Sequence, residues 1–135
     1  MDDFLSDNQR TWQDGDTPNL TVTILDGASN PIPLSNVVTL KLDQWIAQGK
    51  GLPGLKINNR KGQNVLNANN VTVGSTSGLV TWQLQTADTA MQANDTTVLE
   101  EKHWYEFTLT YTAAVGTLQK AYRDYYIVQR KTVVK

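Results

Sequence analysis

Strict alternation of apolar and polar residues is the feature that most constrains what this chain can fold into. The run VTWQLQ (Val80–Gln85) places each apolar side chain two positions from the next, and successive residues of a strand point to opposite faces. The same period of two occurs over Leu20–Leu25, Val38–Leu42 and Tyr105–Tyr111, with a last strand from about Tyr125 to Val128. These runs are rich in β-branched and aromatic residues, which pack well on a pleated surface. The pattern predicts half-buried strands, with Trp82 in the core.

Turn-forming residues separate the alternating runs. They are Asp14-Gly15-Asp16, Asp26-Gly27, Asn30-Pro31, Ser77-Gly78 and Val115-Gly116-Thr117. Gly, Pro, Asn and Asp supply the backbone conformations that tight turns need. Short strands at regular spacing, separated by such turns, predict an all-β fold, an Ig-like Greek-key β-sandwich.

Two segments depart from this pattern. Residues 86–94 are rich in Ala and begin with cap-forming residues, which predicts one short helical segment. Residues 44–77 hold short apolar pieces between Gly and Asn, and we expect an irregular loop or hairpin insertion outside the main sheet. A chain of 135 residues is one domain by size. The predicted division is an N-terminal tail over 1–11 and a single β-sandwich domain over 12–135.

Composition and charge restrict the classes of function. The chain has no cysteine, which excludes disulfides and Cys-based zinc sites. Its first residues are acidic and unlike a signal peptide, and no apolar run reaches membrane length, so we expect no membrane partner. Residues 44–87 carry four bases and no acid. Four bases without interleaved aromatics predict a solvated loop and no nucleic-acid partner.

The stretch GKGLPG (Gly49–Gly54) has the G-x-G-x-x-G spacing of a dinucleotide-binding loop. That fingerprint requires a strand before it, a helix after it and an acid about 20 residues further on. No Asp or Glu occurs between Asp43 and Asp88, and Pro53 removes a backbone donor inside the motif. We expect a turn-rich loop and no nucleotide cofactor.

The titratable residues show no catalytic or metal-binding set. His103 is the only histidine, and we expect a surface or half-buried residue at the start of a strand. Glu100 and Glu101 are adjacent on a strand, so they point to opposite faces and are expected to be solvated. Asp14 and Asp16 flank a glycine in what reads as a structural turn, with a calcium site as the weaker alternative. The expectation is no enzyme, no cofactor and no metal.

The chain also has candidate interface residues. Trp12 and Trp45 flank irregular segments, and Trp104 lies one position out of phase with Tyr105, so it is exposed or faces a second apolar layer. For Trp12 and Trp45, local packing under a loop is the open alternative. The full set of candidate interface residues is Trp12, Trp45, Lys50, Lys56, Arg60, Lys61 and Trp104.

Three stretches taken together resemble the N-terminal domain of phage baseplate upper proteins. They are DGDTPNLTVTILDGASNPIPLSN (Asp14–Asn36), SGLVTWQLQTADTAM (Ser77–Met91) and WYEFTLTYTAAVGTLQKAYRDYYIVQ (Trp104–Gln129). The first has the Gly-Asp-Thr turn, alternating strand and Pro-Ile turn of that family, and the second its Gly-x-Val-x-Trp strand. The resemblance covers most of the chain except 1–11 and 44–76.

The resemblance implies a virion structural protein of a phage that infects Gram-positive bacteria, assembled in the bacterial host cytoplasm. In that family the domain is an Ig-like sandwich that fixes the distal, receptor-binding part to the tail core, and no catalytic residues belong to it. Its partners would be other virion and tail proteins, with a homo-oligomer expected because tail parts form rings. The alternative is a carbohydrate-binding sandwich that contacts host-wall polysaccharide, motivated by the aromatic residues and an Asn/Gln/Thr-rich surface.

Overall fold

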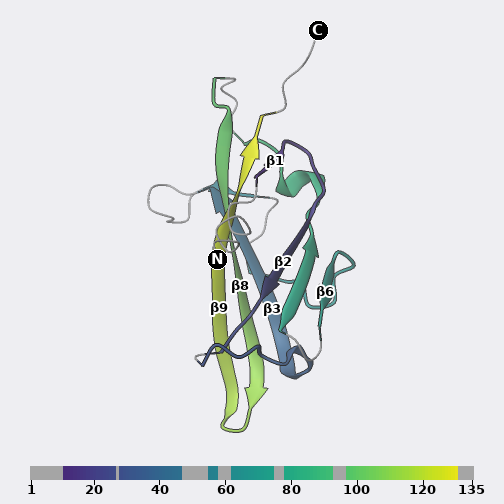
Figure 1. Cartoon of the computed structure of the whole chain (residues 1–135), viewed down its shortest axis with the longest axis vertical. Helices are drawn as coiled ribbons and strands as arrows, with labels where there is room; N and C mark the ends of the chain where they lie inside the picture. The colour runs from purple at the N-terminus through teal and green to yellow at the C-terminus, as the bar shows by residue number, and fades with distance from the viewer. Residues whose placement is uncertain are drawn as a thin grey trace.

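The chain forms two β-sheets packed face to face (Figure 1). The computed structural model describes residues 11–26, 28–46, 55–57, 62–74, 78–92 and 97–130. The larger sheet contains β1 (Thr11–Gln13), β9 (Gly116–Gln129), β8 (Glu100–Ala113), β3 (Val37–Ile46) and β4 (Leu55–Lys56) in that order, and β5 (Gln63–Asn64) also pairs with β3. The smaller sheet contains β2 (Asn19–Thr23), β7 (Leu79–Gln83) and β6 (Val71–Val73).

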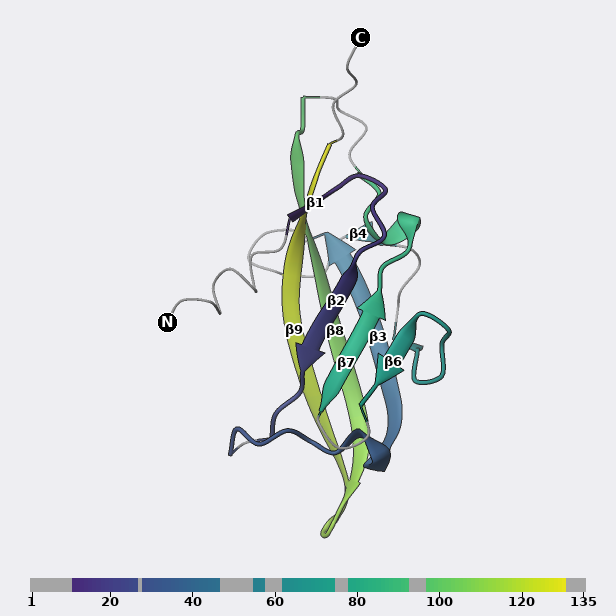
Figure 2. The same ribbon diagram turned by 45° about the vertical axis from the view of Figure 1, so that its right-hand side comes forward.

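A long hairpin of β8 and β9 makes up the largest part of the larger sheet. Each strand has 14 residues, and their antiparallel register holds without a shift from the Glu100–Gln129 pair to the Ala113–Gly116 pair. The short strand β1 lies parallel to β9 but covers only the far end, with Thr11 opposite Ile127. Figure 2 shows β9 along one side of the sandwich, with β1 near one end of it.

The core lies between the two sheets. Trp82 of β7 is fully buried, and its ring lies 5.6 Å from the rings of both Tyr105 and Phe107 on β8. These edge-to-face contacts add to the stabilisation from burying large apolar surfaces. Other core members are aliphatic residues of β2, β3 and β7 at alternating positions. The alternation read from the sequence therefore corresponds to the face that each strand buries.

The predicted all-β sandwich is confirmed, and Trp82 lies in its core as expected. Both strands of the β8–β9 hairpin are longer than the alternation indicates, because β8 begins at Glu100 and β9 begins at Gly116. The finer Ig-like Greek-key assignment stays a prediction.

More residues of the segment 44–77 belong to the two sheets than the sequence predicts. Gln44–Ile46 belong to β3, β4 and β5 pair with β3, and β6 joins the smaller sheet beside β7. The prediction that this stretch lies outside the main sheet is therefore wrong for these pieces. Their short lengths explain the weak signal, since two or three residues are too few to show a period.

The helical segment is shorter than predicted. A single 3-10 turn, η2 (Thr86–Asp88), occupies the start of the 86–94 range, and residues 93–96 lie outside the described part. A second 3-10 turn, η1 (Leu34–Asn36), precedes β3. In the described ranges, neither turn nor any other helix is long and apolar enough to cross a membrane.

Candidate interaction surface

His103 is the residue whose position differs most from the sequence-based expectation. It is fully buried on the inner face of β8, where its Nε2 atom lies 2.9 Å from Oε1 of Glu101. Its Nδ1 atom lies 3.0 Å from the backbone carbonyl oxygen of Asp88. The predictions of a surface or half-buried histidine and of a solvated Glu101 are both wrong. Glu100, on the opposite face, is exposed as expected.

The two partners of His103 are both oxygen atoms that accept hydrogen bonds. A carbonyl oxygen of Asp88 lies at Nδ1, and a carboxylate oxygen of Glu101 lies at Nε2. A ring nitrogen that carries a proton donates to the oxygen that it faces. The buried ring is therefore held between two acceptors that come from different parts of the chain.

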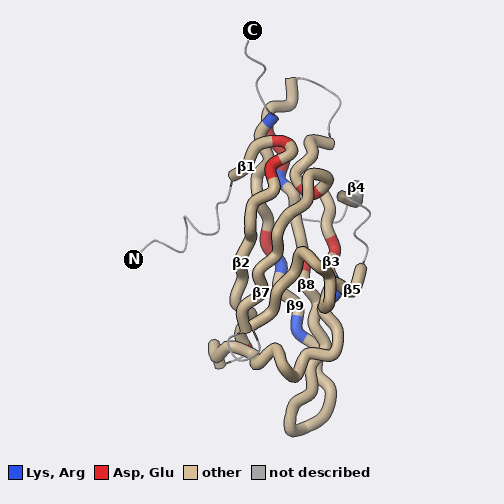
Figure 3. Tube along the Cα trace, turned by 90° about the vertical axis from the view of Figure 1, so that its right-hand side faces the viewer, with Lys and Arg blue, Asp and Glu red and all other residues tan. Residues whose placement is uncertain are grey.

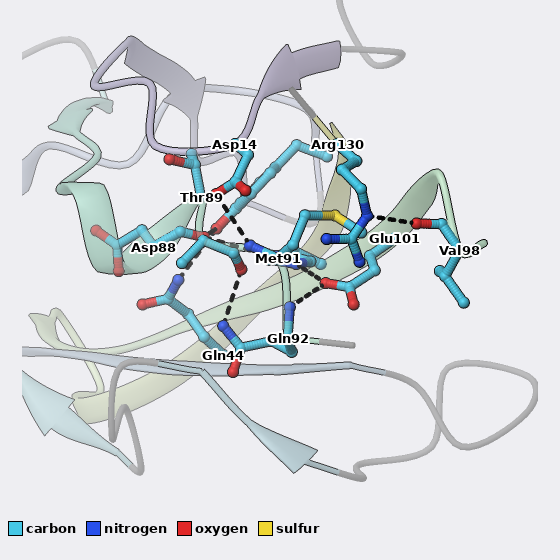
Figure 4. A network of polar contacts seen from close by, with 12 residues as sticks. Asp14, Gln44, Asp88, Thr89, Met91, Gln92, Val98, Glu101 and Arg130 are labelled. Carbon is cyan, nitrogen blue, oxygen red and sulfur yellow. Dashed lines mark hydrogen bonds and ion pairs between the residues drawn. The ribbon is translucent and has the colours of Figure 1, made fainter. Parts of the chain in front are cut away.

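The remaining contacts tie the chain after η2 to the larger sheet. The Tyr126 hydroxyl donates to the Asp88 carbonyl oxygen at 2.7 Å, and Gln44 Nε2 donates to the same hydroxyl at 3.2 Å. The Gln92 N–H donates to Glu101 Oε1 at 2.8 Å. Figure 4 shows Gln44 and Glu101 beside the chain between Asp88 and Gln92. We call Gln44, Asp88, Gln92, Glu101, His103 and Tyr126 the His103 cluster. Its polar groups contact one another and act as a clamp, because they hold the chain after η2 against the larger sheet.

The Asp14-Gly15-Asp16 turn is part of the same clamp. Asp14 Oδ1 accepts from the Met91 N–H at 3.2 Å, and Asp16 Oδ2 accepts from the Gln13 N–H at 2.9 Å. Thr89 Oγ1 donates to the Asp16 carbonyl oxygen at 2.6 Å. Gly15 adopts a φ of 87°, a conformation that favours glycine. The two carboxylates thus serve as acceptors for backbone N–H groups, as the structural-turn prediction implies. Within the described ranges, no three His, Asp or Glu side chains gather where they could hold a metal ion.

The outer face of the larger sheet carries aromatic and cationic side chains. Trp104 of β8 and Tyr125 of β9 are half-buried neighbours whose ring centroids lie 4.9 Å apart. The Lys102 ammonium lies 4.4 Å from the Tyr125 ring, and the Arg123 guanidinium lies 5.3 Å from the Trp45 ring. These distances are within the range of cation–π contacts. We call Lys102, Trp104, Arg123 and Tyr125 the outer aromatic patch.

The predicted interface residues do not all lie at this face. Trp45 lies in β3 opposite Trp104 and under the Arg123 guanidinium, on the same outer face, but it is only 2% exposed. Trp12 is half-buried, with its ring 5.4 Å from the ring of Tyr126, as its local-packing alternative predicts. Trp104 lies in the patch.

The four basic candidates of the 44–77 segment contribute no described side chain. Lys56 lies in β4, opposite Trp45, and only its backbone is described. Lys50, Arg60, Lys61 and the GKGLPG stretch lie outside the described residues. Immediately after that stretch the chain forms a strand, β4, and not the helix that a dinucleotide-binding loop requires.

Two surface grooves lie toward the end of the hairpin opposite β1. One, of about 350 Å³, is lined by Ile24, Leu25 and Ser29 on one side and by Lys120 and Ala121 of β9 on the other. The second, of about 310 Å³, is lined by Ile32, Pro33, Tyr111 and Leu118 among others. Neither groove is lined by a residue of the His103 cluster. Figure 3 shows that the hairpin tip itself carries no charged residue.

No known protein-family model matches this chain, and no curated protein matches it at a significant level.

Proposed function

We propose that the chain is a structural module of a phage virion, an Ig-like sandwich that docks onto other tail or baseplate proteins. The observation that carries the proposal is the outer aromatic patch. Trp104 and Tyr125 form a half-buried aromatic pair on the outer face of the larger sheet, flanked by Lys102 and Arg123. Aromatic residues and Arg are enriched at protein interfaces, where they contribute most of the binding energy.

The strand order supports the Ig-like assignment within this proposal. An Ig sandwich places its second, fifth and fourth strands in one sheet and its third, sixth and seventh in the other. Here β2, β7 and β6 face β3, β8 and β9, in the order expected for those strands. The motif order that resembles baseplate upper proteins supplies the virion context.

The position of the titratable side chains favours an assembly role over catalysis. His103 and Glu101 are buried and bonded to each other, and the His103 cluster lines neither groove. A general base must reach the proton that it removes from a substrate. These side chains instead hold the chain after η2 against the larger sheet.

Carbohydrate binding is the less favoured candidate. A sugar ring would stack on an accessible aromatic face, but the Lys102 ammonium already lies over the Tyr125 ring, 4.4 Å from its centroid. Titration with host-wall polysaccharide, followed by tryptophan fluorescence, tests this alternative. A saturable change that Trp104→Ala removes would establish sugar binding.

Labelling of phage particles tests the assembly role. Antibodies against the chain are applied to particles from the strain that encodes it, and electron microscopy locates the label. We expect label at the tail, and reduced incorporation of a Trp104→Ala/Tyr125→Ala variant that still folds. Thr108→Ala, on the same outer face, is the matched control and should be incorporated normally. Particles that contain none of the chain would contradict the proposal.

A further inference from the structure

The strand β9 has a long open edge. Among the described residues, β1 pairs with β9 only at Ile127, Val128 and Gln129, and no other strand pairs with β9 on the side away from β8. The remaining residues, from Gly116 to Tyr126, lie at the border of the sheet (Figure 2). An open strand edge presents unpaired N–H and C=O groups that can pair with another chain.

The backbone groups that face this edge follow from two hydrogen bonds. The Asp14 N–H donates to the Gln129 carbonyl oxygen at 2.9 Å, so that carbonyl points toward β1. In an antiparallel pair, successive residues point their backbone groups alternately toward the partner strand and away from it. Because the β8–β9 register has no shift, Gln119, Ala121 and Arg123 point their N–H and C=O groups to the same side as Gln129. These three residues form an open ladder.

A groove runs beside this ladder on the inner side of the sheet. It has a volume of about 350 Å³, and its lining includes Ile24 and Leu25 from the chain after β2, and Ala121 from β9. A strand added to the edge would place alternate side chains toward this groove. The groove is large enough for one aliphatic or aromatic side chain of such a strand.

The charges at the groove differ in whether they already have partners. Asp26 accepts from the Ala28 and Asn30 N–H groups at 2.8 and 3.0 Å. The Tyr125 N–H donates to Asp124 Oδ1 at 2.8 Å. These hydrogen bonds fix the two carboxylates but do not neutralise their charges. Asp124 does not line the groove, so the lining contains one acid, Asp26, and two bases, Lys120 and Arg123.

The two bases at the groove, Arg123 and Lys120, differ in whether they are paired with an acid among the described residues. Arg123 pairs with Glu106 at 3.3 Å and lies over the Trp45 ring. Lys120 forms no ion pair with another described residue. Lys120 lines the groove and is the charge that an incoming strand would meet. This favours an acidic partner.

We propose that the β9 edge from Thr117 to Tyr125 binds an extended, acidic segment of a partner protein by strand addition. The partner segment places a carboxylate opposite Lys120 and an apolar side chain in the groove beside Ala121. Main-chain hydrogen bonds to Gln119, Ala121 and Arg123 give affinity, and the groove gives specificity, as in other strand-addition complexes. The inference rests on the proposed assembly role, for which it names the chemistry of one partner.

One register of a second copy of the same chain is disfavoured at this edge. With β1 in place, a second β9 can lie antiparallel beside the first only in a register that places its hairpin tip short of Ile127. In the symmetric register centred on Lys120, the tip residue Val115 falls opposite Tyr125, but the two lysines then face each other. Like charges directly opposite on neighbouring strands are destabilising. A register centred on Gln119 avoids this pair of lysines, so the oligomeric state in solution is one outcome of the test below.

A titration of the full ¹⁵N-labelled chain with synthetic peptides tests the proposal. The probe is the blocked peptide Thr-Val-Thr-Glu-Thr-Val-Thr, and its Glu→Lys version is the matched control. We expect shifts at the amides of Gln119, Ala121 and Arg123, with roughly fivefold tighter binding of the acidic peptide, the scale of a cross-strand charge pair. The variant Lys120→Glu should reverse the peptide preference.

Two further variants separate strand addition from other modes of binding. Ala121→Pro removes an edge N–H and should abolish binding, whereas Ala121→Ser keeps that N–H and should bind normally. Peptide binding that is unchanged in Ala121→Pro, or no amide shift at millimolar peptide, would overturn the proposal. A dimer in light scattering that Ala121→Pro converts to a monomer would assign the edge to a second copy instead. Shifts seen only after removal of residues 1–10 would assign it to the chain's own start.

Failure of this proposal and failure of the assembly role are distinguishable. Edge binding without label on particles would contradict the virion role and leave strand addition intact. Label on particles without edge binding would support the virion role and overturn strand addition.

Discussion

The two ends of the β8–β9 hairpin differ in whether the backbone groups along the edge of β9 are paired. At the closed end, where β1 pairs with Ile127–Gln129, backbone edges are covered and buried polar groups bond to one another. At the open end, from Gly116 to Tyr125, backbone groups face outward beside a groove. The difference means that one hairpin carries both a paired, internally hydrogen-bonded end and the edge that we propose as the docking site.

The largest expected effect is at the closed end. Replacing His103 by Leu removes both ring nitrogens, which face Glu101 and the Asp88 carbonyl oxygen. Removing one member of a buried hydrogen-bonded pair leaves the other without its partner and costs about 1–3 kcal/mol, and more when that partner is charged. We expect the free energy of unfolding to fall by about 3 kcal/mol, as measured by urea denaturation. A loss below about 1 kcal/mol would contradict the clamp role of the His103 cluster.

A pair of proline variants tests the alternation along the open end. Tyr122→Pro removes an N–H that points toward β8, and with it a ladder hydrogen bond, and should cost about 2 kcal/mol. Ala121→Pro removes an N–H that points to the open edge and should cost about 1 kcal/mol or less, since proline is tolerated on edge strands. Thermal unfolding of the two variants gives the comparison. Equal losses at the two positions would show that the edge is covered.

Glutamate 101 offers a smaller and more selective test. Its Oε1 atom accepts from the Gln92 N–H and also faces His103 Nε2. Glu101→Gln replaces the carboxylate by a neutral amide, which weakens both contacts when the amide oxygen takes the position of Oε1 and loses the Gln92 contact when the amide nitrogen takes it. The expected loss of stability is about 1–3 kcal/mol. Glu100→Gln, on the exposed face of the same strand, is the matched control and should change stability by less than about 0.5 kcal/mol.

The smallest effect is expected at the hairpin tip. Val115 is 83% exposed, so Val115→Ser removes little buried surface. We expect a change within about 0.5 kcal/mol in unfolding free energy. A destabilisation above 1 kcal/mol would show that the tip packs against another part of the chain and would weaken the contrast between the two ends.

The sandwich could be predicted from the sequence because alternation reports directly which face of a strand is buried. The His103 cluster could not, because its members are polar residues at inward positions. His103 is in phase with Tyr105, Phe107 and Leu109, which was the available signal. Extending that phase back from Tyr105 places both His103 and Glu101 on the inner face. What the sequence does not show is the partner, because Asp88 and Tyr126 lie far away along the chain.

The interface residues show the same limit. Trp104 could be recognised as out of phase with its strand, and it lies in the outer aromatic patch. Trp45 was misplaced because β3 continues through Asp43 and Gln44, whose polar side chains conceal the end of the strand. The open edge of β9 has no sequence signal of its own, since it depends on how far β1 extends along its neighbour.

Amide hydrogen exchange along β9 of the free chain, resolved residue by residue, is the most direct test of the contrast between the two ends. We predict fast exchange at Gln119, Ala121 and Arg123 and exchange roughly 100-fold slower or more at Lys120 and Tyr122, whose N–H groups point toward β8. We also predict slow exchange throughout the closed end. Equal protection of odd and even positions between Gln119 and Arg123 would contradict the open edge, and with it the proposed mode of docking.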